Sequence, residues 1–94
     1  MVDMPKKVLV VEDEVAIRQL IVLHLRREGF SVEEVGSGEQ ARGLLQQNSY
    51  DLVVLDWMLP GMSGLEITRW MRQNSGHQRT PILFVTAKTV TALS

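Results

Sequence analysis

The sequence predicts an α/β fold, a doubly wound parallel sheet, and two observations support this prediction. Uninterrupted apolar runs recur at residues 8–11, 52–55 and 82–85. Runs without polar alternation are typical of strands that helices cover on both faces. Between the runs, apolar residues recur at the spacing of a helix. Strands and helices should therefore alternate along the chain, with right-handed crossovers between parallel strands.

Length and composition limit the possible functions. The chain has 94 residues, enough for one small domain, and its net charge is −1. It therefore has no basic field with which to attract nucleic acid or an anionic membrane. It contains no cysteine, which excludes disulfides and thiolate metal sites, and its first apolar run is too short for a signal peptide or a membrane span. We expect a cytoplasmic chain without direct nucleic acid or membrane binding.

The first half of the chain predicts a strand, a helix and a second strand. After the strand at residues 8–11, a helix is expected over about residues 15–28, and Gly29 suits its left-handed stop. Residues 30–35 alternate in part and predict an outer strand. The apolar stripe of the helix comprises Ile17, Leu20, Ile21 and Leu25.

The second half predicts two more helices and two more strands. Ser37 should cap a helix that ends near Asn48, with Gln40 at the capping-box position. After the strand at residues 52–56, Ser63 should cap a helix that ends at residues 74–76. The last strand is expected at residues 81–87, since proline is tolerated at a first strand position.

Acidic residues follow two of the predicted strands. Glu12 and Asp13 follow the first strand, and Asp56 ends the third. Because parallel strands end at one edge, where open α/β sheets bind ligands, we expect these acids to converge there with Thr86. Neighbouring carboxylates repel unless a cation neutralises them, and a hard divalent cation prefers oxygen ligands. Mg²⁺ fits better than Zn²⁺, because neither cysteine nor histidine lies near.

Such a site suits phosphoryl transfer. A carboxylate beside Mg²⁺ can act as a nucleophile and become an aspartyl phosphate, and Asp56 is the candidate. Simpler interpretations remain open at this point. The acidic run at residues 12–14 could be a solvated helix N-terminus, Asp56 a turn residue and Thr86 an ordinary strand residue.

Three segments resemble, in order, the landmarks of a response-regulator receiver domain of two-component signalling. They are VLVVEDE at residues 8–14, LVVLDWMLPGMSG at residues 52–64 and PILFVTAK at residues 81–88. The resemblance covers about residues 7–88 and is nearest in kind to the receivers of winged-helix DNA-binding regulators. It implies a flavodoxin-like sheet of order 2-1-3-4. It also implies that residues 1–94 are a single, C-terminally incomplete receiver domain.

The resemblance also implies roles for individual residues. Asp56 would accept a phosphoryl group from the phosphohistidine of a sensor histidine kinase. Glu12, Asp13 and Asp56 would bind Mg²⁺ together with the backbone carbonyl of Met58. Such a module is a signalling device for transcription regulation. It is not an enzyme beyond its own phosphorylation and dephosphorylation.

The fourth predicted strand would carry the switch. By the same resemblance, Thr86 would be the switch hydroxyl, and Ala87 would leave room for the phosphoryl group. A receiver continues with a helix, a fifth strand that ends in a phosphate-contacting lysine, and a last helix. Lys88 is not in the place of that lysine. We therefore expect the fourth strand to be an exposed edge and the first helix to lack a neighbour, so that the chain associates with itself through one of these surfaces.

Two alternative functions remain. The chain could be a phosphorylation-impaired receiver that acts only by binding other proteins. It could also be a Mg²⁺-dependent aspartyl-phosphate hydrolase, a class that shares this architecture and its nucleophilic aspartate. That class needs a second acid two residues after the nucleophile, and this sequence has Met58 there.

Overall fold

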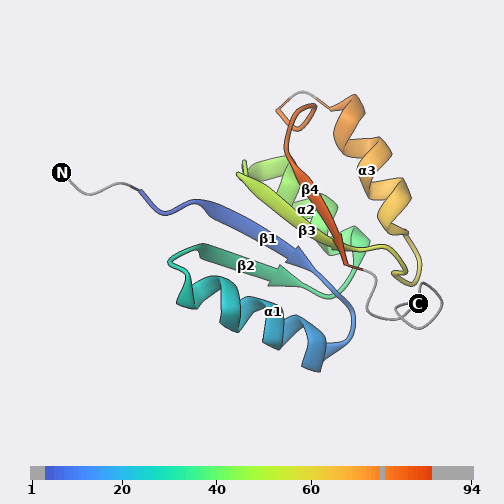
Figure 1. The fold of residues 1–94 in the computed structure, drawn as a ribbon. Coiled ribbons are helices and arrows are strands. Elements are labelled where there is room, and N and C mark those ends of the chain that lie inside the picture. The colour runs from blue at the N-terminus through green and yellow to red at the C-terminus, as the bar shows by residue number, and fades with distance from the viewer. Residues whose placement is uncertain (1–3, 75, 86–94) are drawn as a thin grey trace.

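The computed structural model describes residues 4–74 and 76–85, in which strands and helices alternate strictly (Figure 1). The strands of this part are β1 (Lys7–Val11), β2 (Ser31–Val35), β3 (Leu52–Asp56) and β4 (Ile82–Val85). Its helices are α1 (Val15–Arg27), α2 (Gly38–Gln47) and α3 (Gly64–Gln73). None of these helices combines the length and the apolar character needed to cross a bilayer.

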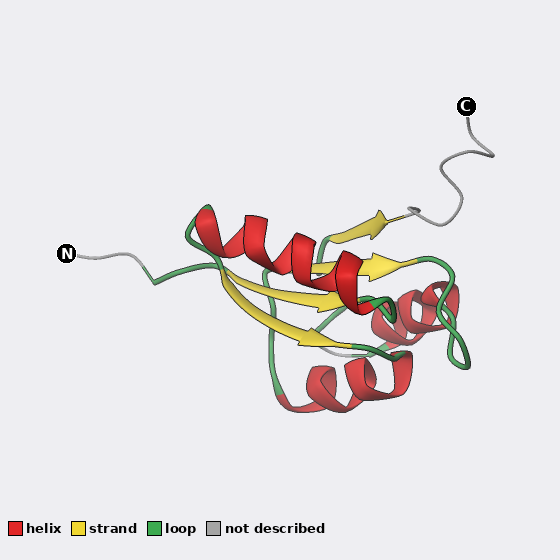
Figure 2. Ribbon diagram, turned by 90° about the horizontal axis from the view of Figure 1, so that it is seen from below, coloured by secondary structure: helices red, strands yellow, loops and turns green. Residues whose placement is uncertain are grey.

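The strands form one parallel sheet in the order β2-β1-β3-β4, which confirms the predicted fold class and strand order. Figure 2 shows α1 on one face of the sheet and α2 and α3 on the other. Because every strand runs in the same direction, all four end at the same edge of the sheet. This edge is where the sequence places its acidic residues.

The two central strands are buried on both faces, as their uninterrupted apolar runs predict. Each fully buried aliphatic side chain contributes about 1.5–3 kcal/mol to folding. The core towards α2 and α3 contains Leu9, Val11, Val53 and Leu55, with Ala41, Leu45, Ile67 and Met71 from the helices. The core towards α1 is smaller and contains Val8, Val10, Val32 and Val54, with Val22 from α1.

The predicted helix boundaries depend on local capping and are close to the observed ones. Ser63 caps α3 through a complete capping box with Glu66. Ser37 caps α2 by accepting a hydrogen bond from the Gln40 N–H, while the Gln40 side chain accepts one from Gly36. Gly29 follows α1 with a φ of 93°, the left-handed conformation that the sequence predicts for it.

The predicted apolar stripe of α1 is confirmed for Ile21 and Leu25 and wrong for Leu20. Leu20, which the sequence places in the stripe, is 56% exposed, whereas Val22 is buried against the sheet. Ile21 and Leu25 pack beside Val22. Apolar residues occur on most sides of α1, so helical spacing indicates the helix but does not by itself separate the exposed Leu20 from the buried Val22. The start of β2 also differs, because Phe30 precedes the strand.

The loop between α3 and β4 is more closely bound to the rest of the fold than its sequence suggests. His77 is buried, and its Nε2 hydrogen-bonds the carbonyl of Leu45 near the end of α2. Because a carbonyl can only accept, Nε2 carries the proton. Arg72 Nη1 donates to the carbonyls of His77, Gln78 and Thr80 at 3.1, 3.3 and 2.8 Å. The loop that leads into β4 is therefore anchored to both α2 and α3.

Candidate functional site

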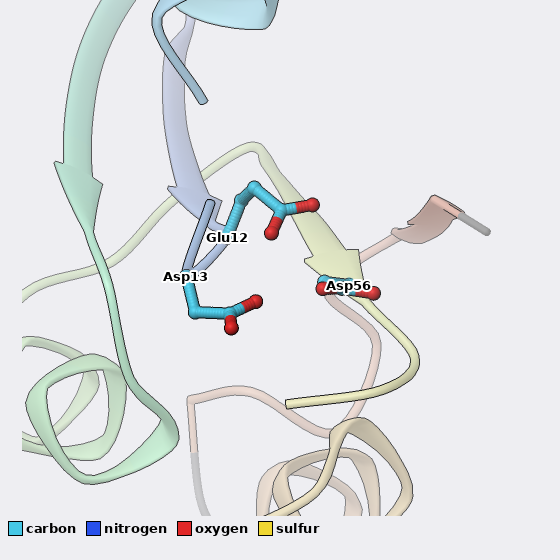
Figure 3. Close-up of side chains that lie close together, drawn as sticks. All are labelled: Glu12, Asp13 and Asp56. Atoms are coloured by element: carbon cyan, nitrogen blue, oxygen red, sulfur yellow. The ribbon is translucent and has the colours of Figure 1, made fainter. Parts of the chain in front are cut away.

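Three carboxylates meet at the carboxyl ends of β1 and β3. Val11 of β1 lies beside Leu55 of β3 in the parallel register, so the residues that follow them, Glu12 and Asp56, are neighbours. Together with Asp13 they offer carboxylate oxygens that all lie within 4.8 Å of one another. Figure 3 shows these side chains gathered over the ends of the two strands. The predicted convergence of the acids is therefore found for these three residues.

Burial changes the acid–base properties of Glu12. Glu12 and Asp56 are each only 1% exposed, while Asp13 is partly buried. Burial raises the pKa of Glu12 from 4.5 to about 7; Asp13 and Asp56 act in the same direction, and the Glu14 N–H that donates to Glu12 Oε2 opposes them. Near neutral pH, the Glu12 carboxyl group is therefore partly protonated, and a bound cation would displace this proton.

The turn after β3 holds the Asp56 carboxylate in place. The Met58 N–H donates to Asp56 Oδ1 at 3.0 Å, which orients the carboxylate from its own chain. Trp57 is 43% exposed and lies edge-on against Phe84 of β4, with ring centroids 5.0 Å apart. Met58 is half exposed, and its backbone N–H faces the Asp56 carboxylate.

The donor set of the cluster fits a hard divalent cation. All three side chains supply carboxylate oxygens, and within residues 4–74 and 76–85 no thiol or imidazole belongs to the cluster. Mg²⁺ prefers oxygen ligands and is usually bound through one or two carboxylates plus phosphate oxygens and water. Neutralisation by such an ion would remove the repulsion between the clustered carboxylates. The remaining predicted site residues, Thr86 and Ala87, and also Lys88, lie outside the described residues.

One residue at this edge, Arg18 of α1, is not predicted from the sequence. Its Nη1 donates to the carbonyl of Glu12 at 2.8 Å, and its Nε donates to Glu34 Oε1 at 3.1 Å. The sequence signal that could have predicted this contact is weak. It consists of an arginine five residues after Asp13 and of Glu34 in the neighbouring strand. Only the fold shows that the two side chains meet beside the acidic turn.

Sequence comparison assigns the chain to a family. The sequence model of the response regulator receiver domain matches residues 8–93. The phosphate regulon transcriptional regulatory protein PhoB of Rhizobium meliloti (strain 1021) is 45% identical over 82 residues, which are 87% of this chain and 36% of that protein. The transcriptional regulatory protein SrrA of Staphylococcus aureus (strain NCTC 8325 / PS 47) is 39% identical over 85 residues, 90% of this chain and 34% of that protein. The chain thus spans about a third of the length of these curated relatives.

Solved structures agree with this assignment. The receiver domain of the sensor histidine kinase PA1611 from Pseudomonas aeruginosa PAO1, solved with a magnesium ion coordinated in its active site cleft, has a TM-score of 0.86 at 31% identity. That match covers 93% of this chain and 71% of the solved one. The chemotaxis response regulator CheY4 of Vibrio cholerae has a TM-score of 0.84 at 29% identity. That match covers 96% of this chain and 77% of the solved one. The buried acidic edge, the strand order and the sequence match together show that this chain belongs to the response regulator receiver domain family of two-component signalling.

Proposed function

We propose that this chain is a phosphoacceptor module that takes a phosphoryl group from the phosphohistidine of a sensor histidine kinase onto Asp56, with Mg²⁺ as its cofactor. The observation that carries the proposal is the meeting of Glu12, Asp13 and Asp56 within 4.8 Å at the ligand-binding edge of the sheet. Membership of the receiver family supports the same reaction class.

The residues of the site would have different roles in metal binding and phosphoryl transfer. Glu12, Asp13 and Asp56 would hold Mg²⁺ together with the backbone carbonyl of Met58. When bound, Mg²⁺ supplies positive charge that offsets the negative charge on the carboxylates and on the phosphoryl oxygens. The Met58 N–H keeps the Asp56 carboxylate turned towards the edge of the sheet by donating to Oδ1. A carboxylate oxygen of Asp56 then bonds to phosphorus as the P–N bond of the donor breaks, and the electron pair stays on the imidazole nitrogen.

The fourth strand would carry the response to phosphorylation. We propose Thr86 as the switch hydroxyl and Ala87 as the small residue that leaves room for the phosphoryl group, on the strength of the family motif. A cytoplasmic location and a role in transcription regulation are proposed on the same basis, because the curated relatives are transcriptional regulatory proteins. The hydrolase alternative gains no support, because Met58 stands where that class needs an acid.

Phosphorylation of Asp56 can be tested directly. Incubation with acetyl phosphate and Mg²⁺ should add the mass of one phosphoryl group to the intact chain, and hydroxylamine should remove it because the product is an acyl phosphate. The adduct should disappear in Asp56→Asn and persist in Asp51→Asn, a matched control for an exposed aspartate just before β3. An adduct that survives in Asp56→Asn would refute the assignment. So would the absence of any adduct under conditions that label an intact receiver.

We also propose that the chain associates with itself through β4. The two outer strands of the described sheet differ: on β2, Arg26 Nη2 donates to the carbonyl of Val32 at 3.2 Å and so occupies one backbone acceptor of that strand. On β4, at the opposite edge, Leu83 and Phe84 are 57% and 38% exposed. The exposed apolar face of α1 around Leu20 is the second candidate surface.

Sedimentation over a range of concentrations tests this association. Leu83→Lys should shift the association equilibrium towards the monomer, because a charge on an edge strand opposes pairing with another strand. The matched change Leu20→Lys, on an equally exposed leucine of α1, should leave the oligomer unchanged. A folded wild-type monomer at high concentration would refute self-association, and dissociation by Leu20→Lys alone would assign it to α1.

A further inference from the structure

We propose that Arg18 is a positioning residue for the acidic turn and that Mg²⁺ affinity depends on it. The inference rests on the proposed metal site at Glu12, Asp13 and Asp56. Arg18 lies in α1, and its guanidinium joins that helix to two other segments. Nη1 donates to the backbone carbonyl of Glu12 at 2.8 Å, and Nε donates to Glu34 Oε1 of β2 at 3.1 Å.

The surroundings of the Arg18 guanidinium hold it in one position. The backbone N–H of Arg18 donates to the carbonyl of Glu14 at 2.9 Å, so the residue starts from a regular turn of α1. The side chains of Arg18 and Glu34 are only 19% and 33% exposed, so their ion pair is partly shielded from water. A Cβ at position 36 would lie 3.1 Å from Arg18 Nη1, and Gly36 therefore leaves the room that the guanidinium fills.

The bond to Glu12 acts on the peptide that links the two metal-binding acids. The carbonyl that accepts from Arg18 belongs to the peptide unit between Glu12 and Asp13. A peptide unit is planar, so holding its oxygen sets the direction in which Asp13 leaves the strand. The N–H of Glu12 is held as well, because it donates to the carbonyl of Val35 at 3.1 Å. Arg18 thus completes the backbone frame from which both carboxylates project towards Asp56.

Positioning and charge predict opposite effects of removing Arg18. A cation beside the site repels a second cation, so charge alone predicts that Mg²⁺ binds more tightly when the arginine is lost. Loss of the bond to Glu12 instead loosens the turn that presents two of the three carboxylates. Residues that orient metal ligands from outside typically change metal affinity by 10- to 100-fold when they are mutated. The sign of the change therefore separates the two explanations.

The test measures Mg²⁺ binding by the full chain, using the fluorescence of Trp57, which is 43% exposed beside Asp56. Arg18→Met should weaken Mg²⁺ binding by about 10-fold. The matched control is Arg26→Met, which removes another arginine of α1 that donates to β2, to the Val32 carbonyl, and should leave Mg²⁺ affinity unchanged. Glu34→Gln should weaken binding less, and the double variant Arg18→Met with Glu34→Gln should bind no more weakly than Arg18→Met alone, because both act through one contact.

A second readout does not require the metal. The amide of Glu14 donates to Glu12 Oε2 at 2.8 Å, so its ¹H–¹⁵N signal reports the conformation of the turn. That signal should shift in metal-free Arg18→Met and stay in place in Arg26→Met. If Arg18→Met does not fold, Arg18→Lys replaces it: lysine keeps the charge but cannot reach both partners with a planar fork, so binding should again weaken.

The outcomes are distinguishable. Unchanged or tighter Mg²⁺ binding by folded Arg18→Met, or wild-type affinity in Arg18→Lys, overturns the positioning role and leaves the proposed function standing. A wild-type chain that binds no Mg²⁺ overturns the proposed metal site instead. In that case an unmoved Glu14 signal in Arg18→Met would overturn the positioning role as well.

Discussion

Alanine at position 64 should lower the free energy of unfolding by about 1–3 kcal/mol and displace the turn that follows Asp56. Gly64 is the buried first residue of α3, and a Cβ there would lie 2.7 Å from the carbonyl oxygen of Asp56 and 3.1 Å from the Cα of Trp57. Both atoms belong to the backbone and cannot rotate away, so the strain would move the end of β3. Urea unfolding measures the loss, and the amide signal of Met58, which donates to Asp56, reports the displacement.

Gly43→Ala is the matched control for this change. Gly43 lies inside α2, and a Cβ there would meet nothing within 4 Å. Alanine should therefore raise stability by about 0.5–1 kcal/mol through its better helix propensity. The two glycine-to-alanine changes should thus have opposite signs. A gain in stability from Gly64→Ala would show that α3 can move away from β3 at little cost.

The stability of the metal-free chain should fall as the pH rises from about 4.5 to about 7, because the pKa of Glu12 is 4.5 ordinarily and about 7 when folded. In this window the folded chain keeps the Glu12 proton that the unfolded chain has already lost. The contribution is fully present below the lower pKa and is lost as the pH passes the upper one. Its limit is about 3 kcal/mol, since each pKa unit corresponds to about 1.4 kcal/mol. Chemical unfolding at a series of pH values measures the slope.

Glu12→Gln should flatten this pH dependence, because glutamine has no proton to lose. Glu14→Gln, at an exposed acid two residues along the same turn, should retain it. Mg²⁺ should restore stability most strongly at the upper end of the window, where it takes the place of the proton. An equal slope in wild type and Glu12→Gln would show that the titration belongs to another group.

The acidic site could be predicted in part from the sequence. Two apolar runs that end in Glu12, Asp13 and Asp56 predict parallel strands with carboxylates at one edge, because strand direction alone brings their ends together. The amount of burial could not be predicted. Glu12 directly follows β1 in an acidic run that reads as a solvated helix start, yet it is 1% exposed, because Val35 and Arg18 hold its backbone against the sheet. Its raised pKa follows from that burial.

Local sequence patterns are sufficient to predict the helices and strands, their order and their caps. Uninterrupted apolar runs, helical spacing, Ser37, Ser63 and Gly29 all act through neighbours along the chain, so local patterns reveal them. The fold was needed to show that Val22 rather than Leu20 packs against the sheet, because apolar residues occur around most of α1. The partners of Arg18 and His77 were decided in the same way. Each binds a backbone carbonyl, a group that every residue carries and that no sequence pattern singles out.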